Sequence, residues 1–206
     1  MTAATTTFLD EKPINRMGFG AMQIAGPGVF GPPRDPGAAR AVLRRAAVPL
    51  EAQLLALEDM RHGGKLDLIG LSNVDQAVVE RALELVDVAE IQNAYSVINR
   101  HDDELITFAR AHQIAFVPFG PLGSAYANGP ARLAADATIG QLAEKRGATP
   151  SQIALAWLLA RYDRMLLIPG TSSIAHLEEN MAAIEICLDD ADLAALDRAG
   201  VTSGAA

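Results

Sequence analysis

The residues of this 206-residue chain that could do chemistry follow short apolar runs. The segment PGTSS (169–173) combines hydroxyls with backbone N–H groups ahead of an amphipathic stretch, an arrangement that suits a phosphate at a helix N-terminus. Ser72 and Asn73 of the GLSN segment can bind a carboxamide, and Gln92 and Asn93 are polar groups inside an otherwise apolar run. Each has a structural alternative, namely a helix cap, a turn, or a buried amide that bridges the core.

A fourth motif is PFGPLG (118–123), in which the aromatic Phe119 precedes a glycine loop that lets the backbone approach a ligand. His176 and Glu179, in the first turns after PGTSS, offer partners to a nucleotide phosphate and an amine. Each motif is weak alone. Together they place polar groups at the carboxyl ends of four successive apolar runs, where parallel α/β folds form their sites.

Short apolar runs alternate with amphipathic stretches along most of the chain. The runs predicted as strands are residues 16–23, 66–71, 88–94, 114–119 and 165–168. The predicted helices are residues 38–47 and 50–61, a helix from Asp75, a helix from Asp102, two helices opened by capping boxes at 138–141 and 149–152, and residues 174–183 and 189–199. This alternation is typical of an α/β fold with a parallel sheet or barrel. Between the helices that meet at Val48 and Leu50, however, the alternation lacks a strand.

Composition narrows the function classes. Half of the residues are hydrophobic and 20% are charged, which is enough apolar content for a packed core. The formal net charge of −8 disfavours nucleic acid and anionic membranes as partners. No apolar run reaches the ~18 residues that span a bilayer, and the first residues lack the basic and apolar regions of a signal peptide. With a single cysteine, Cys187, no internal disulfide can form, so we expect a cytoplasmic protein.

The order of the segments GFGAMQ, GLSN, IQNAYS, PFGPLGS and IPGTSSIAHLEEN resembles the aldo-keto reductase family of NADP-dependent (β/α)8 barrels. The resemblance extends from Arg16 to Ala199 and implies NADP(H) as cofactor and a small-molecule carbonyl substrate. It assigns Ser72, Asn73 and Gln92 to the nicotinamide carboxamide. It also places Phe119 where the family commonly has a tyrosine that stacks on the nicotinamide ring.

The rest of the cofactor is assigned by the same resemblance. The implied contacts are Gly120, Leu122 and Gly123 to the pyrophosphate, Gly170, Thr171, Ser172 and His176 to the adenosine 2′-phosphate, and Glu179 and Asn180 to the adenine. Family members often have Lys and Arg where this chain has Gly170 and His176. This departure weakens the expected preference for NADP over NAD.

The resemblance also explains the missing strand. At the 48/49 junction, family members carry strands two to four, which supply the catalytic Asp, Tyr, Lys and His, and none of the four has a counterpart here. Each βα unit is ~30 residues long, so about 90 residues are absent. We therefore expect a loose tail over residues 1–13 and a single partial (β/α)8 barrel over residues 14–206. This barrel would keep about five parallel strands, the first and the last four.

Other residues that could do chemistry fit structural roles better. Tyr95 is expected to be a packed aromatic with a hydrogen-bonded hydroxyl, and Trp157 a core residue. Residues 101–104 (HDDE) resemble a metal cluster but fit an acidic first helical turn, so no metal site is expected. Residues 124–137 are expected to form a loop over the site.

The sequence thus predicts an NADP(H)-dependent reductase of aldehydes and ketones whose activity is weak or lost, because no catalytic residue is identified. Two alternatives stay open: a non-catalytic NADP(H)-binding or regulatory module, and an unstable product of a deleted gene. A partial barrel would also have exposed sheet edges, through which a homodimer could form.

Overall fold

The computed structural model describes residues 5–7, 13–15, 49–123 and 128–202. The predicted strand 16–23 and helix 38–47 lie outside these residues.

Two short strands pair antiparallel near the start of the chain, β1 (Thr5–Thr7) and β2 (Pro13–Asn15). A strand therefore occupies part of the stretch predicted as a loose tail. The physical reason is that β1 consists of three β-branched threonines, which favour extended backbone.

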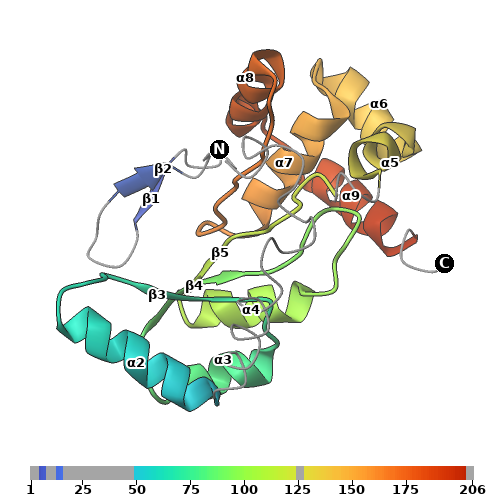
Figure 1. Cartoon of the computed structure of the whole chain (residues 1–206). Coiled ribbons are helices and arrows are strands. Elements are labelled where there is room, and N and C mark those ends of the chain that lie inside the picture. The colour runs from blue at the N-terminus through green and yellow to red at the C-terminus, as the bar shows by residue number, and fades with distance from the viewer. Residues whose placement is uncertain (1–4, 8–12, 16–48, 124–127, 203–206) are drawn as a thin grey trace, which may run out of the picture.

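The centre of the fold is a three-stranded parallel sheet in the order β3-β4-β5 (Figure 1). Its strands are β3 (Ile69–Ser72), β4 (Val88–Gln92) and β5 (Ala115–Phe116). β4 and β5 lie within apolar runs predicted as strands, and β3 extends one residue past its predicted run. The last predicted run, 165–168, is joined to β5 by a parallel bridge between Phe116 and Met165. The predicted α/β class is confirmed, and the described residues hold three of the expected strands plus this bridge.

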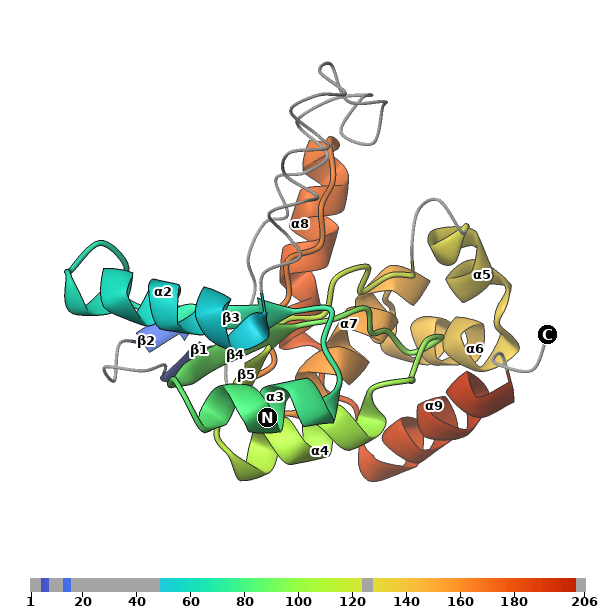
Figure 2. The same ribbon diagram turned by 60° about the horizontal axis from the view of Figure 1, so that its bottom comes forward.

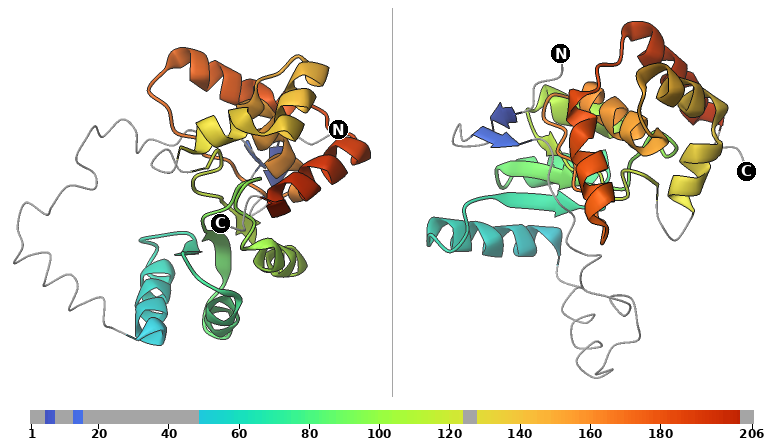
Figure 3. Two further views of the ribbon diagram at one scale, coloured as in Figure 1. Left: turned by 90° about the vertical axis from the view of Figure 1, so that its right-hand side faces the viewer. Right: turned by 90° about the horizontal axis from the view of Figure 1, so that it is seen from above.

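Three helices pack along one face of the sheet: α2 (Leu50–His62), α3 (Gln76–Leu83) and α4 (Asp103–Ala111), which lie side by side in Figure 3. They begin within one residue of the predicted starts, and α2 ends one residue after its predicted end. The Asp75 side chain accepts a hydrogen bond from the Val78 N–H at 2.9 Å and so caps α3. Gly63 follows the last residue of α2, and Gly64 has a φ of +66°, a conformation that glycine adopts without strain.

The opposite face of the sheet is only partly covered. Strand residues on the helix side, such as Leu71 and Ile91, are buried, whereas the residues that alternate with them are fully or partly exposed. Gly70 pairs with Glu90, and Ser72 pairs with Gln92, in the β3-β4 ladder. We call the face that these four residues share the open face; it corresponds to the interior side of a barrel, since the helices lie outside.

The second half of the described chain is helical. Its elements are α5 (Gly129–Ala135), α6 (Ala137–Arg146), α7 (Pro150–Arg161), α8 (Ile174–Ala182), the short 3-10 helix η4 (Ala183–Glu185) and α9 (Asp190–Thr202). Figure 2 shows α5, α6, α7 and α9 gathered at one end of the sheet, with α8 projecting from it. Helix α7 is the core of this half, because every residue from Ile153 to Leu159 is buried.

Two predictions for this half were wrong. The stretch 124–137, predicted as a loop, contains α5, since Pro130 is suited to a first helical turn. Helix α6 is capped by Asp136, which accepts from the N–H groups of Thr138 and Ile139 at 2.9 and 3.0 Å, and not by a capping box from Thr138. The capping box between Thr149 and Gln152 is confirmed.

Across the described ranges, no helix is both long and apolar enough to cross a membrane.

Candidate functional site

The carboxyl ends of β3 and β4 bring three of the expected cofactor residues together. The Ser72 hydroxyl donates to the Gln92 carbonyl oxygen at 3.0 Å, and the Asn73 N–H donates to the same oxygen at 3.0 Å. Asn73 has a φ of +56°, a left-handed conformation that asparagine adopts more readily than most residues. This turn leaves the Ser72 and Asn73 side chains exposed at the strand end.

The two neighbouring amides of β4 have different environments. Asn93 is 5% exposed, and its side chain accepts from the Val74 N–H at 3.1 Å and donates to the Val74 carbonyl at 2.7 Å and to Asp102 at 2.9 Å. It is therefore a structural bridge. The partly buried Gln92 side chain, by contrast, has no hydrogen-bond partner among the residues described. A partly buried amide without a protein partner is suited to a polar ligand.

Phe119 stands beside these residues. Its N–H donates to the Asn93 carbonyl at 2.9 Å, and its side chain is 39% exposed, which is unusual for a phenylalanine next to a sheet. The turn that follows uses positive φ at Gly120 (+63°) and Gly123 (+73°). A Cβ on Gly123 would lie 2.8 Å from the Gly129 Cα, so this loop packs too closely for a side chain there. Leu122, between the glycines, is partly buried against the core.

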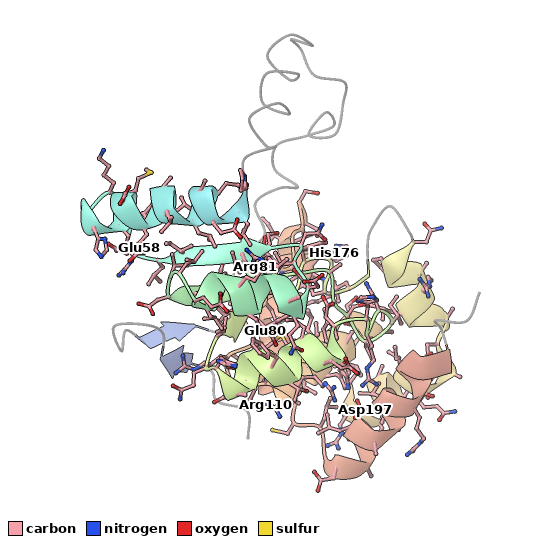
Figure 4. All side chains as sticks on the ribbon, turned by 90° about the horizontal axis from the view of Figure 1, so that it is seen from below. Glu58, Glu80, Arg81, Arg110, His176 and Asp197 are labelled. Carbon is pink, nitrogen blue, oxygen red and sulfur yellow. The ribbon has the colours of Figure 1, made fainter. Side chains whose placement is uncertain are left out.

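The segment before α8 forms a second group. The Thr171 hydroxyl accepts from the Ser173 N–H at 3.1 Å, and the Ser173 hydroxyl accepts from the His176 N–H at 3.4 Å, so the plain serine cap is present. Gly170, Ser172 and the His176 side chain are exposed (His176 is labelled in Figure 4).

The adenine-side residues of this second group have mixed surroundings. Glu179 is partly buried, and its carbonyl accepts from the Gln152 side chain at 2.9 Å. Asn180 is 5% exposed. The sequence has no lysine or arginine between residues 169 and 185, so this group lacks the cations that usually recognise a phosphate. Within the described ranges, no hydrogen bond or ion pair joins this group to the ends of β3 and β4.

Glu90 is a residue that the sequence analysis missed. It lies on the open face two positions before Gln92, and burial raises the pKa of its carboxyl. The signal was available in the strand VAEIQ, where Glu90 and Gln92 alternate with apolar residues and therefore share a face.

A second polar cluster is structural. Tyr95 is 1% exposed, its ring stacks on Trp157 with centroids 5.9 Å apart, and its hydroxyl donates to Asp103. Burial, followed by the Asp103 hydrogen bond, raises the pKa of the Tyr95 hydroxyl, which makes it a poorer acid. Arg100 and Arg161 lie over the Trp157 ring at 5.4 and 5.2 Å. The predicted structural roles of Tyr95 and Trp157 are confirmed.

The HDDE segment likewise has a structural role. Asp103 and Glu104 occupy the first turn of α4, as predicted, and Asp103 pairs with Arg100 and Arg161. In the part of the chain that the structure describes, no group of three His, Cys, Asp or Glu side chains could hold a metal ion.

Comparison with known proteins decides the family. The sequence profile of the aldo/keto reductase family matches residues 43–200. The chain belongs to the aldo/keto reductase family. It is 32% identical to pyridoxine 4-dehydrogenase of Escherichia coli over 286 aligned positions, which cover 95% of this chain and 98% of the relative.

Solved aldo/keto reductases share the fold. The Klebsiella pneumoniae enzyme in complex with NADPH is 30% identical, with a TM-score of 0.67 over 73% of this chain and 54% of that one. A thermostable aldo-keto reductase solved with the inhibitor epalrestat is also 30% identical, with a TM-score of 0.66 over 74% of this chain and 56% of that one. An uncharacterised oxidoreductase of Schizosaccharomyces pombe is 32% identical and is matched over 50% of its length. The chain thus spans about half the length of most of these relatives.

Proposed function

We propose that this aldo/keto reductase binds NADP(H) at the carboxyl ends of β3 and β4 and reduces aldehydes or ketones with low turnover. The observation that carries the proposal is the Gln92 side chain, a partly buried amide at a strand end with no described protein partner. A nicotinamide carboxamide offers both a donor and an acceptor, which is what an unpaired glutamine amide requires. The NADPH complex of the related Klebsiella protein supports this choice of cofactor.

The neighbouring residues fit the same cofactor. Ser72 and Asn73 present hydroxyl and amide groups at the adjacent strand end, and the exposed Phe119 ring can lie against the nicotinamide. Gly120 and Gly123, where φ is positive, leave two positions of the turn without side chains, so that the backbone can approach a pyrophosphate beside Leu122. When bound, the cofactor supplies a hydride, and these residues hold and orient it.

The segment before α8 would hold the adenosine end. Gly170, Thr171, Ser172 and His176 are placed for the 2′-phosphate, with Glu179 and Asn180 beside the adenine. Because hydroxyls and one histidine replace the usual cations, we propose that the preference for NADP(H) over NAD(H) is small.

Low turnover follows from the missing barrel strands. The 286 positions aligned with the E. coli relative hold about 196 residues of this chain (95% of 206), so about 90 positions of the relative face no residue here, the length of three βα units. We place this gap at the 48/49 junction, within a single partial barrel over residues 14–206. The segment implied to be missing carries the acid and base groups, and losing general acid catalysis slows a reaction by about 10²–10⁴-fold.

The test is a titration with NADPH, followed by quenching of protein fluorescence. We expect saturable binding by the wild type and about tenfold weaker binding by Gln92→Ala, which corresponds to about 1.4 kcal/mol of lost hydrogen bonding. Gln141→Ala, on the exposed surface of α6, is the matched control and should bind as the wild type does. Absence of NADPH binding by the folded wild type would remove the proposal.

A second candidate function is a non-catalytic NADP(H)-binding module, which the missing strands favour. It predicts the same saturable binding of NADPH but no consumption of NADPH with a panel of aldehydes. The panel includes pyridoxal because the E. coli relative is a pyridoxine 4-dehydrogenase. A cooperative thermal melt would in turn dismiss the third alternative, an unstable gene product.

Two finer proposals concern the surroundings of the protein. β3 is an edge of the described sheet, so a homodimer could form there, and sedimentation would reveal it. The free, exposed Cys187 supports a reducing, cytoplasmic location.

A further inference from the structure

Glu90 occupies a defined place on the open face. It pairs with Gly70 of β3 and Ala115 of β5, and it precedes Gln92 by two residues on the same strand. Two residues of a strand span about 6.6 Å, so the Glu90 backbone lies one pleat below the amide proposed to hold the nicotinamide.

Among the residues that the structure describes, the carboxyl of Glu90 has no partner. Among the described residues it makes no hydrogen bond and no ion pair, although it is partly buried. Its strand neighbours on this face, Gly70, Ser72 and Ala115, carry no charge. The ionised form of a carboxyl group in such a position is disfavoured, because the group has lost part of its hydration and no protein group compensates for that loss.

Gly70 makes room for this side chain. A Cβ at position 70 would lie 2.7 Å from the Glu90 Cγ and 3.1 Å from Oε1, so the glutamate lies directly over the glycine. The absence of a side chain on Gly70 lets the Glu90 carboxyl extend across the open face, over the exposed Gly70 of β3.

We propose that Glu90 replaces part of the acid function implied to be missing from this chain, and that it donates its proton to the oxygen of a carbonyl substrate bound on the open face next to Gln92. This inference rests on the proposed NADP(H) function. In the step, the Glu90 O–H bond breaks and its proton passes to the carbonyl oxygen, while the hydride that bound NADPH would supply completes the reduction at the carbonyl carbon. The products are an alcohol, the oxidised dinucleotide and the Glu90 carboxylate, which water protonates again.

The electrostatic surroundings of Glu90 suit this role. Burial raises the pKa of its carboxyl, so a larger fraction holds a proton near neutral pH than in an ordinary glutamate. No described cation faces it from β3, β4 or β5 to reverse that effect.

The test compares the wild type with Glu90→Gln, which keeps the size of the side chain but removes its acidic proton. NADPH consumption is measured with pyridoxal and benzaldehyde between about pH 6 and pH 9, and turnover by Glu90→Gln should fall at least about 100-fold. The wild-type rate should fall about tenfold per pH unit above the Glu90 pKa. The residual rate of Glu90→Gln should not show this decrease with pH. Glu84→Gln, at the exposed end of α3, is the matched control and should behave as the wild type does.

Two measurements do not depend on turnover. The NADPH dissociation constant of Glu90→Gln should stay within about twofold of the wild type, because the glutamate serves the substrate. Without cofactor, the wild type should lose stability relative to Glu90→Gln as the pH rises through the raised pKa of Glu90, since the folded state disfavours the ionised carboxyl.

Three outcomes separate the two proposals. If the wild type does not bind NADPH, the proposed function fails. If it binds NADPH without consuming it, or if Glu90→Gln keeps the rate and pH profile of the wild type, the proposed function as a binding site stands and the role of Glu90 is overturned.

Discussion

Replacing Trp157 with phenylalanine should lower the free energy of unfolding by about 2–4 kcal/mol, and the structure shows where that loss arises. The Trp157 indole N–H donates to the Asp197 carboxylate of α9 at 2.9 Å, and phenylalanine cannot make this bond (Asp197 is labelled in Figure 4). A hydrogen bond to a charged group contributes about 1.5–3 kcal/mol. Asp197 keeps a contact with Arg161 at 3.4 Å and is 39% exposed, so the loss lies toward the lower end of that range.

The arginines add a second contribution. Arg100 and Arg161 lie within 5.4 Å of the Trp157 ring centre, and a phenyl ring attracts a cation less than an indole does, by a fraction of about 1 kcal/mol each. The smaller ring also leaves unfilled space at a position that is 0% exposed.

Chemical unfolding in urea, followed by far-UV circular dichroism, measures the change. For a chain of this size, the melting temperature should fall by about 5–15 °C. The double variant with Asp197→Ala tests the mechanism, because the two single losses should overlap by about 1 kcal/mol or more if they remove one shared bond. A loss below about 0.5 kcal/mol for Trp157→Phe, or strict additivity in the double variant, would refute the reasoning.

Two further predictions concern helices α6, α7 and α9. Thr149→Ala should cost about 1 kcal/mol in thermal melts because it removes the capping box of α7, whereas Thr138→Ala should change little, since Asp136 caps α6. Asp192→Asn should lower the free energy of unfolding by about 1–3 kcal/mol at pH 7, because Asp192 is 2% exposed and accepts a hydrogen bond from the Lys145 ammonium at 2.6 Å. Burial alone would raise the pKa of the Asp192 carboxyl, but the hydrogen bonds from Lys145 and Arg146 hold it below its usual 3.8. The stability that the wild type has over Asp192→Asn is therefore complete above pH 3.8 and is lost as the pH falls through the lowered pKa of Asp192. Unfolding in urea across this pH range would measure the difference. A stability difference that persists in acid would contradict the assignment.

The sheet was predictable from sequence because its strands are short apolar runs that contrast with the amphipathic helices between them. β4 and β5 lie inside predicted runs, and β3 overlaps its run and extends one residue past it. Local chemistry caused the errors in the helices. Asp136 outcompetes Thr138 as a cap because its carboxylate reaches two N–H groups at once, and the Gly129-Pro130 pair that begins α5 also fits a loop.

Only part of the candidate site could be predicted from the sequence. The position of Gln92 follows from the strand pattern, but its lack of a partner does not. Asn93, the next residue, satisfies its amide with Val74, 19 residues away, and with Asp102, and such pairings depend on how distant segments meet. Glu90 is a similar case: its place in the strand can be read from the sequence, whereas its isolation depends on the uncharged neighbours that the sheet register supplies.

The contacts of α9 have a consequence for how the protein is made. Asp192 pairs with Lys145 and Arg146 of α6, and the Asp197 carbonyl accepts from Arg100 at 2.8 Å. A ribosome synthesises these three cations before α9, at about 5–20 residues per second. While the chain is still emerging, Lys145 and Arg146 therefore lack their Asp192 partner, and the Trp157 indole lacks Asp197, for several seconds. Chaperones that bind nascent chains would meet this protein in that interval, and the docking of α9 would end their access.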